Sequence, residues 1–149
     1  MELDAVDIGL IQALCERSRL SYRELAKQVG VSVATALNRV RRLEQEGVIR
    51  ASTIRLDYEK LGYDVGVLIQ VRVSKGKLFA VEKKIAVDPH VTALYDITGS
   101  FDAMVVARFK SRRSLDAFLK KVQGYEFVER TETMLILNEM AEKHVRLVL

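Results

Sequence analysis

The apolar positions in the first fifty residues recur at helical spacing, and they predict three short helices. The first covers residues 3–16. The second starts at Ser21, where Glu24 three residues on completes a capping-box pattern, and it ends at Gly30, because glycine readily adopts the left-handed conformation that stops many helices. The third covers residues 32–46. The glycine-containing turn between the second and third helices makes this stretch a candidate helix-turn-helix.

The third predicted helix has two chemically different faces. Ala36, Val40 and Leu43 stand at i, i+4 and i+7, so they predict an inward apolar stripe. The opposite, outward side is expected to carry Thr35, Asn38, Arg39, Arg41 and Arg42. An α-helix fits the DNA major groove, where arginine pairs with guanine and asparagine with adenine. The alternative is an ordinary helical hairpin with a solvated charged face. The candidate DNA-binding residues are Ser32, Val33, Thr35, Leu37, Asn38, Arg39, Arg41 and Arg42.

Beyond residue 50 the helical period gives way to alternating strands and helices. Residues 51–56 alternate roughly between apolar and polar, which predicts a short strand that is either a wing or a linker. Residues 57–63, DYEKLGY, are mostly polar and contain a glycine, so we expect a hinge there. The pattern therefore divides the chain into a first domain at 1–50, a linker strand and hinge at 51–62, and a second domain at 63–149.

The second half predicts four strands and two helices in the order βαββαβ. The strands are expected at 65–73, 91–98, 102–109 and 127–137, and the helices at 77–87 and 112–123. This order is that of the ferredoxin-like fold, an antiparallel sheet with both helices on one face. Residues 139–148 can form a final helix or an arm. The predicted fold class is α+β, with a helix-turn-helix (winged-helix-like) domain joined to a ferredoxin-like domain.

One face of the predicted sheet has no helix to cover it. Residues 65–71 and 104–107 are almost continuously apolar, so both faces of these strands should be apolar. An uncovered apolar face of this size requires a partner. We therefore expect a homodimer through that face, with two-fold symmetry as the default.

Composition narrows the class of protein. The chain has 149 residues, 49% of them apolar, and no apolar run approaches the roughly 20 residues of a membrane span. The acidic start, MELDAVD, is unlike a secretory signal. The single cysteine, Cys15, cannot form an internal disulfide, which favours a reducing, cytoplasmic setting. We interpret Cys15 as a small packed or half-exposed side chain rather than a nucleophile, because no histidine lies near it in sequence.

The net charge of +4 is modest, but its distribution is uneven. Residues 1–16 carry four acidic side chains and no basic one, whereas residues 17–42 carry seven basic side chains and a single acidic one. A basic region of this kind steers a protein towards phosphate and makes its binding salt-dependent.

A turn in the second half combines features of a small-molecule site. Free backbone amides around Gly99 could hold a carboxylate, and Asp102 could pair with an α-ammonium group. Thr131 and Thr133 occupy alternate strand positions, so their hydroxyls point the same way. The alternative is plain turn chemistry, which also favours glycine and aspartate. The candidate effector-binding residues are Gly99, Ser100, Asp102, Thr131, Thr133 and Tyr95.

The sequence offers no pattern for catalysis or metal binding. His90 and His144 lie far apart and have no acids or cysteines at metal-ligand spacing. A phosphate loop and a nucleophile motif are also missing, so we expect no catalytic residue, no metal and no cofactor. A small enzyme with a ferredoxin-like catalytic domain is therefore the weaker alternative. A nonspecific architectural DNA binder would use the same arginines without reading bases.

Five stretches, in this order and spacing, resemble the leucine-responsive regulatory protein/asparagine synthetase regulator (Lrp/AsnC) family. They are LDAVDIGLIQAL at 3–14, ELAKQVGVS at 24–32, NRVRRLEQEGVI at 38–49, TGSFD at 98–102 and ERTETMLIL at 129–137. The resemblance covers nearly the whole chain. It implies a transcription regulator with an N-terminal DNA-binding domain and a C-terminal domain for assembly and amino-acid sensing. It further implies dimers, often four of them joined in an octamer, with amino-acid effectors held between dimers near the TG-x-x-D turn.

The recognition helix departs from the family pattern. Family members often have two basic residues in its middle, where this chain has Asn38 followed by Arg39. Asn38 and the preceding Leu37 would suit adenine and a thymine methyl group, so the family pattern does not determine which DNA sequence this chain prefers.

Overall fold

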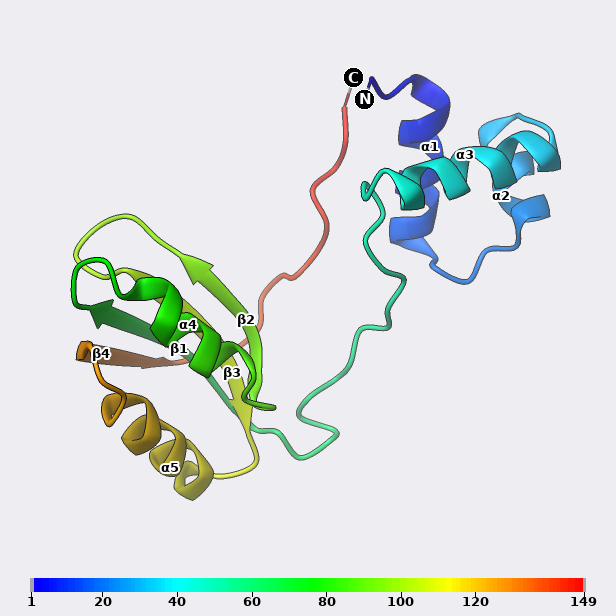
Figure 1. Ribbon diagram of the computed structural model, residues 1–149. Helices are drawn as coiled ribbons and strands as arrows, with labels where there is room; N and C mark the ends of the chain where they lie inside the picture. The colour runs from blue at the N-terminus through cyan, green and yellow to red at the C-terminus, as the bar shows by residue number, and fades with distance from the viewer. Residues whose placement is uncertain (1, 149) are drawn as a thin grey trace. The chain divides into compact units, whose positions relative to one another are not determined.

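The structure, a computed structural model, describes residues 2–148 and divides into two compact units (Figure 1). The first unit contains the residues up to Leu56 together with those from Ala141 onward, and the second unit runs from Asp57 to Met140. Each unit has its own cluster of buried apolar side chains. Within residues 2–148, every helix is too short or too polar to cross a membrane.

The first unit is built on three helices, as the periodicity predicts. Helix α1 spans Ala5–Glu16, α2 spans Tyr22–Val29 and α3 spans Val33–Gln45. The predicted capping box of Ser21 and Glu24 starts α2, which satisfies backbone N–H groups that a helix otherwise leaves free. Six buried side chains hold the helices together: Leu10, Ala13, Leu25, Ala26, Ala36 and Val40.

Residues 51–56 do not form the strand that their alternation predicts. They have no regular secondary structure, and none of the described residues of the first unit belongs to a strand that could pair with them. An extended segment without a neighbour leaves its backbone N–H and C=O groups unpaired, so alternation alone cannot make a strand. For the same reason this part of the chain contains no wing hairpin.

The segment from Ala141 onward packs on the first unit, whereas the sequence placed it in the second domain. The side chain of Gln12 donates a hydrogen bond to the backbone carbonyl of Leu147 at 2.6 Å. Arg55 likewise donates to the backbone carbonyl of Glu142. Residues 136–148 have no regular secondary structure, so the predicted "helix or arm" is an arm. The carbonyls of Glu142 and Leu147 accept hydrogen bonds from distant side chains instead of from the backbone amides of a helix.

The second unit has the predicted order βαββαβ. Its strands are β1 (Val65–Val73), β2 (Val91–Asp96), β3 (Ala103–Phe109) and β4 (Val128–Leu135), and its helices are α4 (Leu78–Ala86) and α5 (Arg112–Gln123). The strands form one antiparallel sheet in the order β2-β3-β1-β4, which is the ferredoxin-like arrangement.

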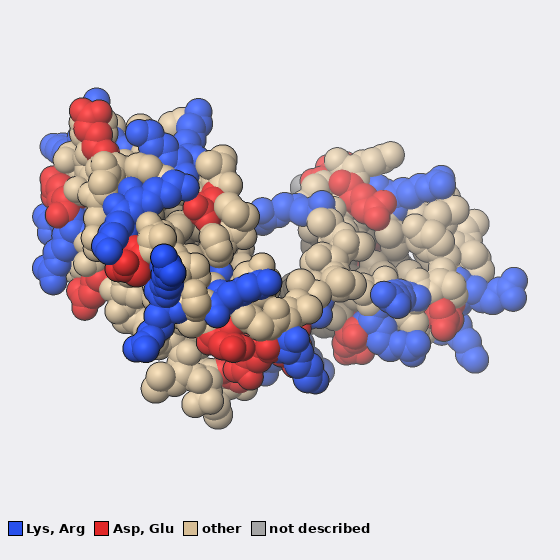
Figure 2. All heavy atoms as spheres, turned by 90° about the horizontal axis from the view of Figure 1, so that it is seen from below, with Lys and Arg blue, Asp and Glu red and all other residues tan. Residues whose placement is uncertain are grey.

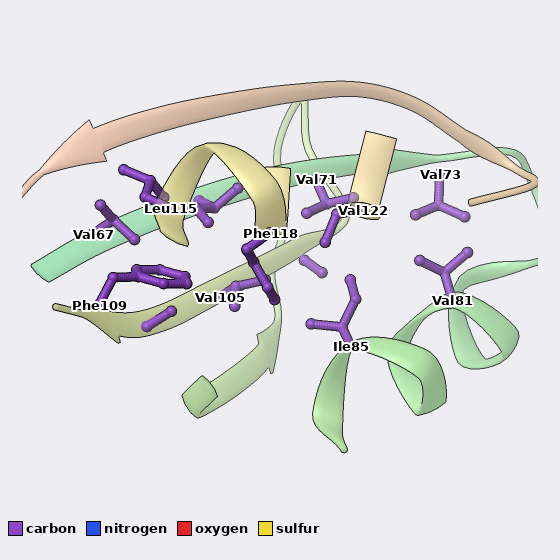
Figure 3. Close-up of a cluster of buried hydrophobic side chains, with 13 residues drawn as sticks. Val67, Val71, Val73, Val81, Ile85, Val105, Phe109, Leu115, Phe118 and Val122 are labelled. Atoms are coloured by element: carbon purple, nitrogen blue, oxygen red, sulfur yellow. The ribbon is translucent and has the colours of Figure 1, made fainter. Parts of the chain in front are cut away.

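The core of the second unit lies between the sheet and its two helices, as Figure 3 shows. Every second residue of β1 and β3 points into this core. Burying these side chains supplies the main driving force for folding of the unit. The largest fully buried side chains of this core are Val67, Ile69, Val71, Val81, Ile85, Val105, Phe109 and Val122.

The opposite face of the sheet carries no helix, as predicted. The strand register aligns two rows of side chains across it. One row is wholly apolar and consists of Ala93, Val106, Leu68 and Met134. The second row is mixed and consists of Tyr95, Met104, Gln70 and Glu132. The face is therefore less uniformly apolar than the runs of residues suggested.

Candidate DNA-binding surface and effector site

The turn between α2 and α3 sets the orientation of α3. Gly30 ends α2 with φ = 78°, a left-handed conformation that residues other than glycine rarely adopt. Ser32 then caps α3: its hydroxyl accepts a hydrogen bond from the backbone amide of Thr35 at 3.0 Å and lies 2.8 Å from the Thr35 hydroxyl. The two hydroxyls and the free backbone amides make the start of α3 polar and attractive to anions.

The inward and outward faces of α3 are those that the spacing predicts. Ala36, Val40 and Leu43 are buried. On the other side, the exposed row is Ala34, Asn38, Arg41 and Gln45. Val33 is 47% exposed and Leu37 is half-buried, so both lie beside this row rather than in the core.

Arg39 and Arg42 lie on a different side of α3 and contact α1. Nη1 of Arg39 is 2.7 Å from Oδ2 of Asp4 and 3.2 Å from Oδ2 of Asp7. Nη2 of Arg42 is 2.5 Å from the same oxygen of Asp7. The candidate arginines were expected to share one outward face. The structure separates them, because only Arg41 stands in the exposed row.

Asp7 is completely buried, and its two arginine partners compensate the burial of its charge. A buried carboxylate without partners would cost several kcal/mol. Asp4 lies at the edge of this cluster and caps α1 in a capping box with Asp7. The backbone amide of Asp7, followed by the guanidinium of Arg39, holds the pKa of Asp4 below its usual value. The hydrogen bond that Arg39 donates to the Asp4 carboxylate is in turn the main reason that the pKa of Arg39 is raised.

The surface is rich in basic side chains, and acidic ones stand beside several of them, as Figure 2 shows. Pairing of this kind is not visible in a count of charges along the sequence. Asp4 and Arg39 are 35 residues apart, so their contact follows from the packing of α1 against α3. The acidic side chains of residues 1–16 and the basic side chains of the helix-turn-helix region thus partly neutralise each other.

The predicted effector turn lies between β2 and β3. Gly99 has φ = 115°, and a side chain there would be strained. The carbonyl of Ser100 accepts a hydrogen bond from Arg72 at 3.3 Å. Oδ2 of Asp102 accepts one from the backbone amide of Val73 at 2.7 Å. Asp102 therefore already has a structural partner in this turn.

The other candidate effector residues are not brought together within one chain. Thr131 stands opposite Val71 in the register, and its hydroxyl accepts a hydrogen bond from Gln123 of α5 at 2.9 Å. Thr131 and Thr133 therefore point to the face that the helices cover, although Thr133 is exposed. Tyr95 belongs to the mixed row on the open face, at the other edge of the sheet.

Two family models match the chain, one on its N-terminal part and one on its C-terminal part. Residues 3–50 match winged helix-turn-helix DNA-binding regions, and residues 66–145 match the Lrp/AsnC ligand binding domain. The chain belongs to the Lrp/AsnC family.

Similar proteins extend this match over almost the full chain. An uncharacterized HTH-type transcriptional regulator of Pyrococcus furiosus is 43% identical over 142 residues, which cover 95% of this chain and 96% of that protein. Regulatory protein AsnC of Escherichia coli is 33% identical over 138 residues, covering 91% of this chain and 90% of AsnC. The chain is therefore a transcriptional regulator with a DNA-binding helix-turn-helix region and a ligand-binding domain.

Solved Lrp/AsnC structures share its fold. That of E. coli AsnC has a TM-score of 0.89 and 30% identity, and the match covers 98% of this chain and 99% of the other. That of B. subtilis LrpC has a TM-score of 0.87 and 29% identity over 96% of this chain and 100% of the other. A Neisseria meningitidis transcriptional regulator in complex with L-Met has a TM-score of 0.86 and 25% identity over 95% of this chain and 94% of the other.

The ligand-binding domain of this Lrp/AsnC chain also has an acidic groove that the sequence did not reveal. An open hollow of about 220 Å³ lies between α4 and β2, lined by Phe79, Glu82, Lys83, Ala86, Leu94 and Asp96. Burial and, secondarily, the Asp96 carboxyl group beside it raise the pKa of Glu82 to about 7. No spacing rule links Glu82 to Asp96, because they lie on a helix and a strand.

A second feature that the sequence pattern did not predict is a histidine–carboxylate pair, His90 and Asp88. Nδ1 of His90 is 2.9 Å from Oδ1 of Asp88, and the His90 ring stacks on Phe109 with 4.7 Å between ring centroids. Nζ of Lys121 lies 3.0 Å from the other oxygen of Asp88. These contacts tie the end of α4 to α5. Among residues 2–148, no group of three metal-ligating side chains comes together.

Proposed function

We propose that this chain is a sequence-specific DNA-binding transcription regulator whose assembly and DNA binding respond to an amino acid. The observation that carries the proposal is the exposed row of α3, in which Asn38 and Arg41 lie one turn apart. An asparagine amide can pair with adenine in the major groove, and an arginine with guanine or a phosphate. Val33 and Leu37 beside the row would contact thymine methyl groups.

The start of α3 is proposed to hold the DNA backbone. The hydroxyls of Ser32 and Thr35 and the unpaired amides of the first turn are donors of the kind that bind phosphate. Arg39 and Arg42 stand on the flank of the same helix and remain part of the proposed surface as partly neutralised side chains.

A homodimer is proposed to form through the open face of the sheet. The apolar row that contains Leu68 and Val106 would pair with the same row of a second copy. A two-fold dimer presents two recognition helices to successive major-groove faces, roughly 34 Å apart or a multiple of that distance. Assembly of four dimers into an octamer, which the family resemblance implies, belongs to the same proposal.

The effector is proposed to be an amino acid bound near the turn of Gly99, Ser100 and Asp102. The match to a ligand-binding domain and the L-Met complex of a structural neighbour support this. Because Tyr95 and the two threonines face different sides of the sheet, we propose that a second copy completes the site. An effector that favours one assembly over another would change how DNA is occupied.

Footprinting on the protein's own promoter tests the DNA-binding part. We expect discrete protected sites spaced by whole helical turns. Uniform coverage of the fragment would instead indicate architectural binding without base reading.

Calorimetric titration with the twenty amino acids, run beside light scattering, tests the effector part. At least one amino acid should release or absorb heat and change the assembly state. If none produces heat and none changes assembly, the amino-acid effector is excluded, whatever the footprint shows.

A further inference from the structure

Two of the three arginines in the middle of α3 are already occupied by carboxylates of the same chain. Arg39 contacts Asp4 and Asp7, and Arg42 contacts Asp7. The four side chains carry two positive and two negative charges, so the cluster is neutral as a whole. Arg41 is the arginine of this group that stands in the exposed row.

The occupied guanidinium groups are nevertheless within reach of solvent. The side chains of Arg39 and Arg42 are 31% and 39% exposed. They lie on the flank of the helix that we propose to enter the major groove, where a DNA phosphate would approach. Carboxylate and phosphate oxygens satisfy a guanidinium in the same way, so the two kinds of anion compete for it.

This competition concerns the part of DNA binding that does not depend on sequence. Binding to DNA of any sequence depends mainly on phosphate contacts, each of which releases counterions. Target binding also uses base contacts, which we assign to Asn38 and Arg41 on a separate row. Withdrawing Arg39 and Arg42 from phosphate therefore removes contacts that every duplex can make, so it weakens binding to DNA of any sequence and leaves the base contacts in place.

We propose that Asp4 and Asp7 restrain DNA binding, because their carboxylates hold Arg39 and Arg42 in place of DNA phosphate and so weaken the contacts that do not depend on DNA sequence. The inference rests on the proposed DNA-binding function.

The full-length Asp4→Asn variant is the main test. Asparagine keeps a capping oxygen for the Asp7 amide, which Asp4 Oδ1 now binds at 2.9 Å, but it removes the charge that faces Arg39. The Asp4 side chain is 50% exposed, so the change leaves the core intact. Asp4→Ser, which also retains a capping oxygen, serves as a second variant if the first fails to fold by circular dichroism.

Glu16→Gln is the matched control. It makes the same change in net charge on the same helix, but Glu16 is the last residue of α1 and lies roughly 18 Å from Asp4 along the helix axis. It is exposed. A simple effect of net charge would appear equally in both variants.

The measurement is fluorescence anisotropy with a labelled duplex of random sequence between about 50 and 200 mM salt. One extra phosphate contact steepens the dependence of log affinity on log salt by about 0.9. The Asp4→Asn protein should therefore lose about 3.5-fold more affinity over this range than the wild type, and Glu16→Gln should match the wild type. The double variant Asp4→Asn/Arg39→Gln should return to the wild-type slope, because the gain runs through Arg39.

If log affinity falls with log salt equally steeply in Asp4→Asn and in the wild type, the proposal is overturned. An equal steepening in Glu16→Gln, or a double variant that keeps the steep slope, would overturn it as well. Failure of the wild-type protein to bind any duplex would instead remove the proposed DNA-binding function on which the inference rests.

Discussion

The carboxylate of Asp102 and the backbone amide of Val73 are joined by a hydrogen bond of 2.7 Å, which fixes the turn before β3 against the end of β1. The backbone of Asp102 adds two more hydrogen bonds, one to the carbonyl of Val71 and one from the amide of Ile97. Asp102, which the sequence suggests as a ligand contact, therefore also holds the turn against the sheet.

Replacing Asp102 with alanine should destabilise the second unit by about 1–3 kcal/mol, because a backbone amide loses a charged acceptor. Asp102→Asn should lower the free energy of unfolding by less, since its amide oxygen can still accept the hydrogen bond from the Val73 amide. Urea unfolding measures both. Ser100→Ala is the control in the same turn, and it should unfold like the wild type. Equal stability of Asp102→Ala and the wild type would show that the Val73 amide finds water instead.

Asn38→Ala should separate base reading from backbone binding. We expect its affinity for a target site to fall by about 1–3 kcal/mol, with little change for random DNA. Arg41→Ala should do the same if Arg41 reads a base, or weaken both duplexes and lower the salt slope by about 0.9 if it contacts phosphate. Arg113→Ala, a change of equal charge at an exposed position of α5 in the second unit, is the control. An Asn38→Ala protein that binds both duplexes like the wild type would remove Asn38 from the interface.

Charge placed on the open face of the sheet should prevent self-association. Leu68 lies in the apolar row of that face, so Leu68→Arg would bury an unpaired guanidinium in the proposed dimer. Light scattering should then report a single subunit. Ala117→Arg on the exposed side of α5 adds the same group elsewhere and should leave the assembly unchanged. A Leu68→Arg protein that still dimerises would place the interface on another surface.

The raised pKa of Glu82 predicts a pH-dependent stability. Between about pH 4.5 and 7 the folded protein keeps a proton on Glu82 that the unfolded chain has lost, so the free energy of unfolding falls as pH rises through this range. Above about pH 7 both states are ionised at this group, and its contribution stays constant.

Glu82→Gln keeps the side chain neutral at every pH. The variant should exceed the wild type in stability by about 1 kcal/mol above pH 7, a value reduced for partial solvation of the groove, and match it near pH 4. Denaturant unfolding at several pH values measures the difference. Glu126→Gln, an exposed residue of the same unit, should show no such trend. A difference that does not vary with pH would mean that Glu82 titrates normally.

The helices and strands were predictable because their signals are local. Ser21, Glu24 and Gly30 define both ends of α2 within ten residues of sequence, and they do so in the structure. The βαββαβ order likewise follows from period and turns, and it limits the topology to a few arrangements. Residues 51–56 carried the same kind of local signal but form no strand, because a strand depends on a neighbour that no local pattern supplies.

The candidate sites were less predictable, because they depend on how elements face one another. The sequence indicates correctly that Thr131 and Thr133 share a face, but the register with β1 decides which face. The same limit applies to α3. Helical spacing places Arg39 outside the buried apolar stripe of α3. Its ion pair with Asp4, however, depends on the packing of α1 against α3.

The arm that returns from β4 to α1 has a practical consequence for anyone who labels this protein. A fluorophore on Val148 would travel with the three-helix unit, although by position in the chain it follows the sheet. A dye meant to report on the sheet belongs instead at the exposed turn of Lys75 and Gly76, between β1 and α4. An affinity tag attached to this arm should be tested for interference with DNA binding, because the arm belongs to the three-helix unit.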